Sequence, residues 1–260
     1  MRFCLTLVLV ACAARPAAAQ DQPQASQAAA QLPAPRRSPD FFFGRPMGSV
    51  AVRGTWSLSR AGSDWYDFVT DQLTLNRSDF NAPGITGDLA VTLTDRMDAV
   101  IGVDYSRMNT TSEYRNFVDN NRQPINQTTR LQQVHVTGSL RLALTDRGRS
   151  VSTLAWVPRK VTPFVSAGAG MVYYDLKQSG DFVDALDPRL AVFSDVFYSE
   201  GWAPTAHVSG GVDVRVAKRL FMSFEGRYRW AKADLARQWV DFDPIDLSGL
   251  RLSAGINVPF

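Results

Sequence analysis

Cysteine is nearly absent from this sequence. The 260 residues include only Cys4 and Cys12, both close to the start of the chain. If the first segment is removed during secretion, the remaining chain has no cysteine for a disulfide framework, a thiol nucleophile or a thiolate metal site. Such a chain also suits an oxidising compartment, where free thiols would mispair.

Long apolar runs are scarce as well. Residues 3–14 form the only long apolar stretch without a charge, and no later stretch approaches the roughly 20 apolar residues that a membrane-spanning helix needs. Any insertion into a membrane after residue 20 would therefore have to use β-strands.

An excess of charge of one sign is also lacking. The net charge is +3, from 28 basic and 25 acidic residues. Loss of Arg2 and Arg15 with the first segment would take the 28 basic residues to 26, against the same 25 acidic ones. A chain this close to neutral is not expected to have nucleic acid as a partner.

The first 19 residues have the organisation of a secretory signal peptide. Arg2 supplies positive charge, residues 3–14 supply the apolar segment, and Ala17-Ala18-Ala19 supplies the small-residue cleavage site. We expect cleavage before Gln20. An alternative remains open, because Leu9-Val10-Ala11-Cys12 resembles the lipobox of bacterial lipoproteins, which would leave an acylated Cys12 at the N-terminus.

The rest of the chain divides into a leader and a barrel domain. Residues 20–40 are rich in Gln, Ala, Pro and Ser, a composition typical of a flexible periplasmic leader. Residues 41–260 contain alternating segments long enough for the roughly 9 to 11 residues of a tilted membrane strand. The predicted strands are 48–59, 83–94, 98–108, 129–145, 161–176, 204–217, 220–231 and 248–260.

The connections between these strands differ in length. Two are tight, at 95–97 and 218–219, and 146–160 is intermediate. Short turns on one side and long loops on the other are typical of bacterial outer-membrane barrels, with the turns in the periplasm. The long loops are expected at 60–82, 109–128, 177–203 and 232–247.

The last strand shows the alternation most clearly. Leu252, Ile256 and Phe260 fall on one face, and Arg251 and Asn257 fall on the other. Aromatic residues near strand ends and long unbroken apolar faces favour an apolar face turned to lipid. We therefore predict an all-β fold, an eight-stranded antiparallel up-and-down transmembrane β-barrel, with the even-numbered residues of the last strand facing lipid.

Two segments resemble a known family. The alternating strand that ends at Phe260 resembles the signal read by the barrel-assembly machinery, and residues 162–170 resemble the proline-aromatic, glycine-rich strand of OmpA-like small outer-membrane barrels. The resemblance covers roughly residues 42–260 and lacks the peptidoglycan-binding domain of full-length OmpA. It implies a place in the bacterial outer membrane, contact with its lipid and lipopolysaccharide, and assembly through Phe260.

The predicted inward faces carry charges of both signs. An eight-stranded barrel is just wide enough for side chains to fill. We expect these charges to pair into a packed network without an open pore, because an unpaired buried charge costs several kcal/mol. The predicted inward charges are Arg53, Asp88, Asp104, Arg141, Asp213, Arg215, Glu225, Arg227, Arg229 and Arg251.

His207, Ser209 and Glu225 are the candidate catalytic residues. Their types resemble those of outer-membrane lipid A deacylases, in which a histidine polarises a serine and a carboxylate orients the histidine. The alternation points all three into the barrel, away from lipid. We therefore interpret them as structural and expect no enzyme. His135 has no ligand-spaced partner and is interpreted as another interior polar residue.

The last long loop concentrates carboxylates at Asp241, Asp243 and Asp246. Oxygen-rich clusters can bind calcium, but this one lacks the glycine turn and the distal glutamate of an EF-hand loop. We interpret it as a solvated acidic loop and expect no metal ion and no cofactor. The loop at 177–203 mixes acids with aromatic residues, a composition that could bind an extracellular ligand or fold back over the barrel mouth.

Three classes of function stay open on these observations. A structural or surface-interaction barrel is favoured, because the interior is expected to be packed. The alternatives are a narrow, porin-like solute channel and a lipid A deacylase-like enzyme that uses His207, Ser209 and Glu225.

Overall fold

The structure is a computed structural model that describes residues 41–119, 122–153, 155–183 and 192–260. The expected signal peptide at 1–19 and leader at 20–40 lie outside the described residues. The described residues belong to one compact unit, Pro39–Phe260.

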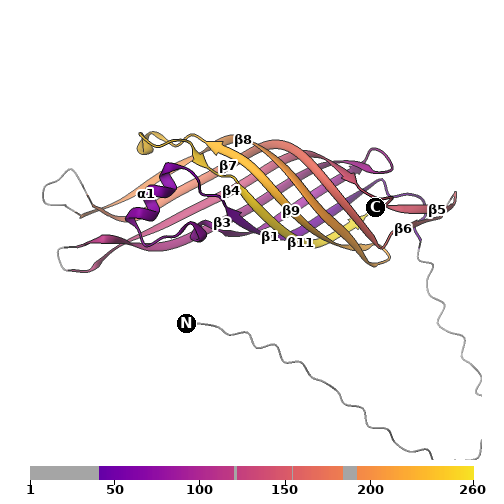
Figure 1. The fold of residues 1–260 in the computed structure, drawn as a ribbon, viewed down its shortest axis with the longest axis horizontal. Helices are drawn as coiled ribbons and strands as arrows, with labels where there is room; N and C mark the ends of the chain where they lie inside the picture. The colour runs from indigo at the N-terminus through magenta and orange to yellow at the C-terminus, as the bar shows by residue number, and fades with distance from the viewer. Residues whose placement is uncertain (1–40, 120–121, 154, 184–191) are drawn as a thin grey trace, which may run out of the picture. The chain divides into compact units, whose positions relative to one another are not determined.

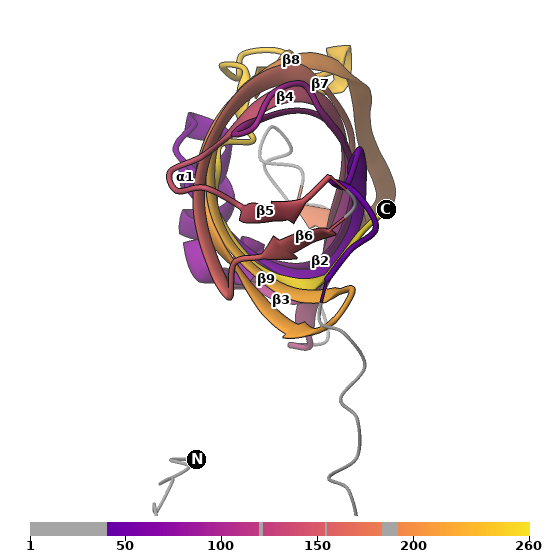
Figure 2. The same cartoon turned by 90° about the vertical axis from the view of Figure 1, so that its right-hand side faces the viewer.

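Eight long strands form a closed ring (Figures 1 and 2). Each pairs antiparallel with the next along the chain, and β11 pairs with β1 to close the sheet. This confirms the predicted eight-stranded up-and-down barrel. The ring strands are β1 (Gly48–Ser59), β2 (Ala82–Thr92), β3 (Met97–Val118), β4 (Pro124–Ala143), β7 (Val161–Val183), β8 (Val192–Ala217), β9 (Leu220–Ala233) and β11 (Gly249–Pro259).

The two ends of the barrel differ. At the turn end, the strand pairs β2–β3, β4–β7 and β8–β9 are connected; at the long end, the β3–β4 and β7–β8 hairpins extend furthest (Figure 1). No helix in the described part of the chain is long and apolar enough to cross a membrane. The remaining elements are α1 (Asp64–Gln72), η1 (Arg77–Phe80), β5 (Gly148–Ser152), β6 (Ala155–Pro158), η2 (Arg237–Trp239) and β10 (Ile245–Asp246).

The prediction of long loops at 109–128 and 177–203 was wrong, because these two segments consist largely of strand. The β3–β4 ladder continues past Met108 and Leu131 as far as Glu113 and Asn126. The β7–β8 ladder likewise continues to Val183. Their polar residues suggested loops, but backbone pairing in a hairpin does not require an apolar face. The other two predicted loops contain α1 with η1, and η2 with β10.

The outward face of the ring is apolar between its two ends. Large side chains there are more than a third exposed, and a continuous apolar surface of this kind is unstable in water. A lipid environment removes that cost, and the closed ring leaves no unpaired strand edge in the bilayer. The barrel is therefore a transmembrane barrel. Its lipid-facing belt includes Val50, Val52, Ile85, Leu89, Ile101, Val103, Val136, Leu140, Val165, Met171, Val208, Met222, Phe224, Leu252, Ile256 and Val258.

The belt is bordered by aromatic residues toward the long end. Trp56, Tyr105, Trp202 and Trp230 are exposed on the outward face there. Such residues favour the interface between hydrocarbon and water, because their rings are apolar and carry one polar group. On β11 the even-numbered residues are exposed and Arg251 and Asn257 are buried, which confirms the predicted alternation.

A second, apolar core fills the long end. Trp65 and Tyr66 of α1 and Val172 and Leu176 of β7 are fully buried there. The Tyr66 hydroxyl donates to the Asp246 carbonyl at 3.1 Å, and burial raises the pKa of this phenol. The filling of the barrel thus changes along its axis, from polar at the level of the belt to apolar beyond it, as in a water-soluble protein.

Helix α1 covers this second core. Asp64 and Asp67 lie in its first turn, where negative charge interacts favourably with the helix dipole. Its buried residues include Trp65 and Val69, which are one helical turn apart and therefore lie on the same face. After the helix, Leu73 pairs with Tyr114 of β3. The helix therefore covers the side of the long end that β1 and β2 do not reach.

A small hairpin crosses the mouth at the turn end (Figure 2). It is formed by β5 and β6, in the connection 146–160 that was expected to be of intermediate length. Phe42 and Trp156 exchange two backbone hydrogen bonds of 2.8 and 3.1 Å, which tie the hairpin to the segment before β1. Trp156 lines a cavity of about 80 Å³ together with Phe164 and Asn257 from the barrel interior, so the hairpin covers that interior.

Candidate functional site

The candidate site is the polar interior at the level of the lipid belt. All ten predicted inward charges occupy inward-facing positions of their strands, because successive side chains of a strand alternate between lipid and interior. Nearly all of them are buried. What the site can do depends on whether these charges leave a path between them.

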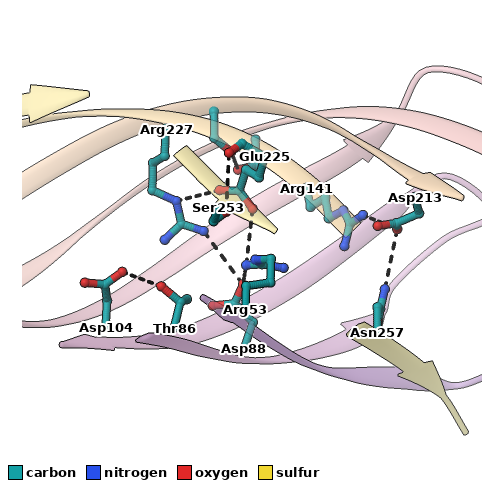
Figure 3. Close-up of polar contacts among 12 residues, drawn as sticks. Arg53, Thr86, Asp88, Asp104, Arg141, Asp213, Glu225, Arg227, Ser253 and Asn257 are labelled. Carbon is teal, nitrogen blue, oxygen red and sulfur yellow. Dashed lines mark hydrogen bonds and ion pairs between the residues drawn. The ribbon is translucent and has the colours of Figure 1, made fainter. Parts of the chain in front are cut away.

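Four of the charges form a central cluster (Figure 3). Arg53 pairs with Asp88 and lies 3.2 Å from Glu225. Arg227 lies 2.6 Å from Glu225 and 3.7 Å from Asp88. Two guanidinium groups thus share two carboxylates, and these residues come from β1, β2 and β9. Pairing of this kind offsets the desolvation cost of each charge.

Asp104 lies at the centre of a second cluster, toward the long end. It pairs with Arg251 and with Arg229, the latter at 3.0 Å, and accepts a hydrogen bond from the Thr86 hydroxyl. Arg251 also donates to the Ser106 hydroxyl at 3.0 Å. The carboxylate therefore joins β2, β3, β9 and β11 across the barrel.

Further pairs continue toward the turn end. Asp213 pairs with Arg141 and lies 3.4 Å from the amide nitrogen of Asn257. Arg147 pairs with Asp98 at 2.7 Å. This last pair was not among the predicted inward charges, because Asp98 begins a predicted strand and Arg147 falls in the predicted connection 146–160. Charged pairs thus fill the interior from the second core to the hairpin at the turn end.

No protein-family model matches this chain. No curated protein matches it either. Among solved structures, it is similar to Neisserial surface protein A, with 10% identity and a TM-score of 0.46, covering 84% of this chain and 99% of that one. It is also similar to Ail, the attachment invasion locus protein of Yersinia pestis, with 12% identity and a TM-score of 0.43, covering 81% and 98%.

A third similar structure is the outer membrane protein OprG from Pseudomonas aeruginosa. The identity is 10% and the TM-score 0.41, with 84% of this chain and 99% of that chain covered. At identities this low, the description of the barrel rests on the chain's own closed ring of strands and on its apolar belt.

The three candidate catalytic residues point into the barrel, as predicted, but the structure does not bring them together. Glu225 is held by Arg53 and Arg227. The Ser209 hydroxyl lies 2.6 Å from that of Ser166. Neither ring nitrogen of His207 has a hydrogen-bond partner among the described residues. A nucleophile needs its base within hydrogen-bonding reach, and this arrangement lacks that contact.

The other histidine is also an interior residue. His135 is buried, and its Nε2 lies 3.2 Å from the Gln133 side-chain oxygen. This places it among the inward polar residues, as the sequence suggested.

The acidic loop is only partly solvated, which corrects the prediction. Asp241 and Asp243 are exposed, but Asp246 is 2% exposed. The Asp246 carboxylate accepts the backbone N–H of Ser248 at 3.0 Å. Its side chain thus stabilises the entry to β11. Within the described ranges, no three His, Cys, Asp or Glu side chains are grouped so that they could hold a metal ion.

Proposed function

We propose that this chain is an OmpA-like barrel of the bacterial outer membrane with a structural or surface-interaction role and no enzymatic activity. The observation that carries the proposal is the central cluster of Arg53, Asp88, Glu225 and Arg227. These four side chains join β9, β1 and β2 inside the barrel at the level of the lipid belt. A filled interior supports anchoring and display in preference to transport.

The partners follow from the two surfaces of the barrel. The lipid-facing belt contacts outer-membrane lipid and lipopolysaccharide. Strand β11, with Phe260 exposed, is the segment that the barrel-assembly machinery would recognise. The long end faces outside the cell and the turn end faces the periplasm, because bacterial barrels have short turns in the periplasm.

Planar bilayers test the closed interior. We expect no stepwise conductance from the purified chain. We also expect none after replacement of 148–158, the hairpin at the turn end, by a short turn, because the charged clusters remain in place. A conductance step in the unaltered chain would favour the channel. A step in the shortened chain alone would show that the hairpin closes the barrel.

Cysteine labelling on intact cells tests the orientation. The chain has no cysteine after Cys12, so single-cysteine variants report one position each. We expect a membrane-impermeant maleimide to label Gln123→Cys, at the long end, and to leave Arg96→Cys unlabelled until the outer membrane is opened. The opposite pattern would place the turn end outside.

A further inference from the structure

The long end contains an aromatic pocket above the second core. Its volume is about 250 Å³, and its walls come from α1, the protruding parts of the β3–β4 and β7–β8 hairpins, and the segment around η2. It faces the inside of the protruding sheet, beyond the aromatic border of the lipid belt. The charged clusters lie below it, so the pocket ends within the barrel.

The rings in this pocket form one continuous series. Phe193 contacts Phe182, Phe182 contacts Phe197 and Phe197 contacts Trp239, with ring centroids 6.0, 4.7 and 5.6 Å apart. The series continues from Trp239 to Phe242 at 6.1 Å and from Phe242 to Phe68 at 5.4 Å. A ligand with a flat ring can pack edge-to-face or offset against such a wall.

The polar groups of the pocket are uncharged. Among the residues that the structure describes, no Asp, Glu, Lys or Arg side chain lines it. The side-chain amide of Gln178 donates to Gln127 at 2.5 Å, and that of Gln127 donates to the Asp181 carbonyl at 2.9 Å, so these amides are held in place. The indole N–H of Trp239 is buried and has no acceptor among the described residues. This nitrogen is closed off from the open space of the pocket, so the lining meets a ligand chiefly through its aromatic rings.

We propose that this pocket binds an uncharged aromatic molecule of about two fused rings. A dry apolar cavity of about 150 Å³ holds benzene, so a pocket of this size accommodates a second ring. A charged ligand is disfavoured, because the described lining residues offer no opposite charge to compensate its desolvation. The site goes beyond the proposed role of the barrel, since it adds a small-molecule ligand at the outward-facing end.

Fluorine NMR on the full mature chain in lipid nanodiscs tests the site. The six tryptophans are replaced by 5-fluorotryptophan, and the Trp239 signal is identified by its loss in Trp239→Phe. We expect 2-naphthol, which is uncharged at neutral pH, to shift the Trp239 signal to saturation. Trp202 lies on the lipid-facing surface and reports partition into the bilayer, which does not saturate over the same range. We expect no saturable shift from 2-naphthalenesulfonate.

A matched pair of variants locates the binding. Phe193 lines the pocket and is 41% exposed, so Phe193→Asp adds a charge at the rim without burying it in the core. We expect this variant to weaken 2-naphthol binding by about tenfold or more, which corresponds to about 1.4 kcal/mol. Tyr198→Asp, on the opposite face of the same strand and 55% exposed, should leave the affinity unchanged.

Three results would overturn the proposal. They are a Trp239 shift that never saturates, equal binding of the naphthol and the sulfonate, and equal weakening by the two aspartate variants. An unchanged Trp65 signal in the ligand-free variants shows that the second core is intact, so a loss of binding cannot be ascribed to unfolding.

Discussion

Asp104→Asn is expected to lower the free energy of unfolding by about 3–5 kcal/mol, the range typical of breaking a buried ion pair from one side. The Asp104 side chain is 2% exposed and is the shared partner of Arg229 and Arg251. The asparagine has nearly the same shape but no charge, so the two guanidinium groups lose their compensation inside the barrel. Urea unfolding in lipid vesicles, followed by tryptophan fluorescence, measures the change.

Asp175→Asn is the matched control. Asp175 pairs with Arg130 at 2.5 Å on the outward side of the barrel, and both side chains are partly exposed. Removing this partly solvated pair is expected to cost no more than about 1 kcal/mol. Equal losses in the two variants would mean that water screens Asp104 as well, and would contradict both the closed interior and the proposed role that rests on it.

Ile256→Arg is expected to cost about 2–4 kcal/mol, the range found for arginine near the bilayer midplane of membrane barrels. Ile256 lies on the outward face of β11 and is 49% exposed. Its strand partners are Val52 and Met222, which belong to the lipid-facing belt. A guanidinium group there would have to leave water without gaining an ion-pair partner. The same unfolding measurement in lipid vesicles reports the loss.

Asn257→Ser is the control for this substitution. Asn257 is 6% exposed and lies on the inward face, where serine keeps a hydrogen-bonding group toward Asp213, so we expect a small effect. Quenching by brominated lipid then identifies the lipid-facing side directly. A fluorophore at position 256 should be quenched strongly and one at position 257 weakly; no quenching at either position would exclude a transmembrane barrel.

The alternation of side chains made most of the ring predictable. Strand β1 was predicted with the bounds that the structure has, and β9 differs only at its end. The ten inward charges were also predicted correctly, since their positions follow from the period of two along each strand. Both features depend on neighbours in the sequence, and a local pattern is sufficient to show them.

The features that the pattern missed depend on distant residues. Trp65 is buried against Trp239 and Phe80, with ring centroids 5.9 and 5.8 Å apart, and nothing near residue 65 indicates that partner. The β5–β6 hairpin is tied by Trp156 to Phe42, far back in the chain. The pairing of Glu225 with Arg53 likewise joins residues that are far apart in the chain, and the alternation predicted only that both face inward.

By itself, the sequence determined the number of strands, their two unlike faces and the charges that lie on one of them, because each is a local property of the chain. Only the tertiary structure decided which charges pair and where the interior changes from polar to apolar. Asp104 and Arg229 are 125 residues apart in the chain and meet across the barrel. Closure of the ring brings them together, and the low dielectric of the interior makes that pairing necessary.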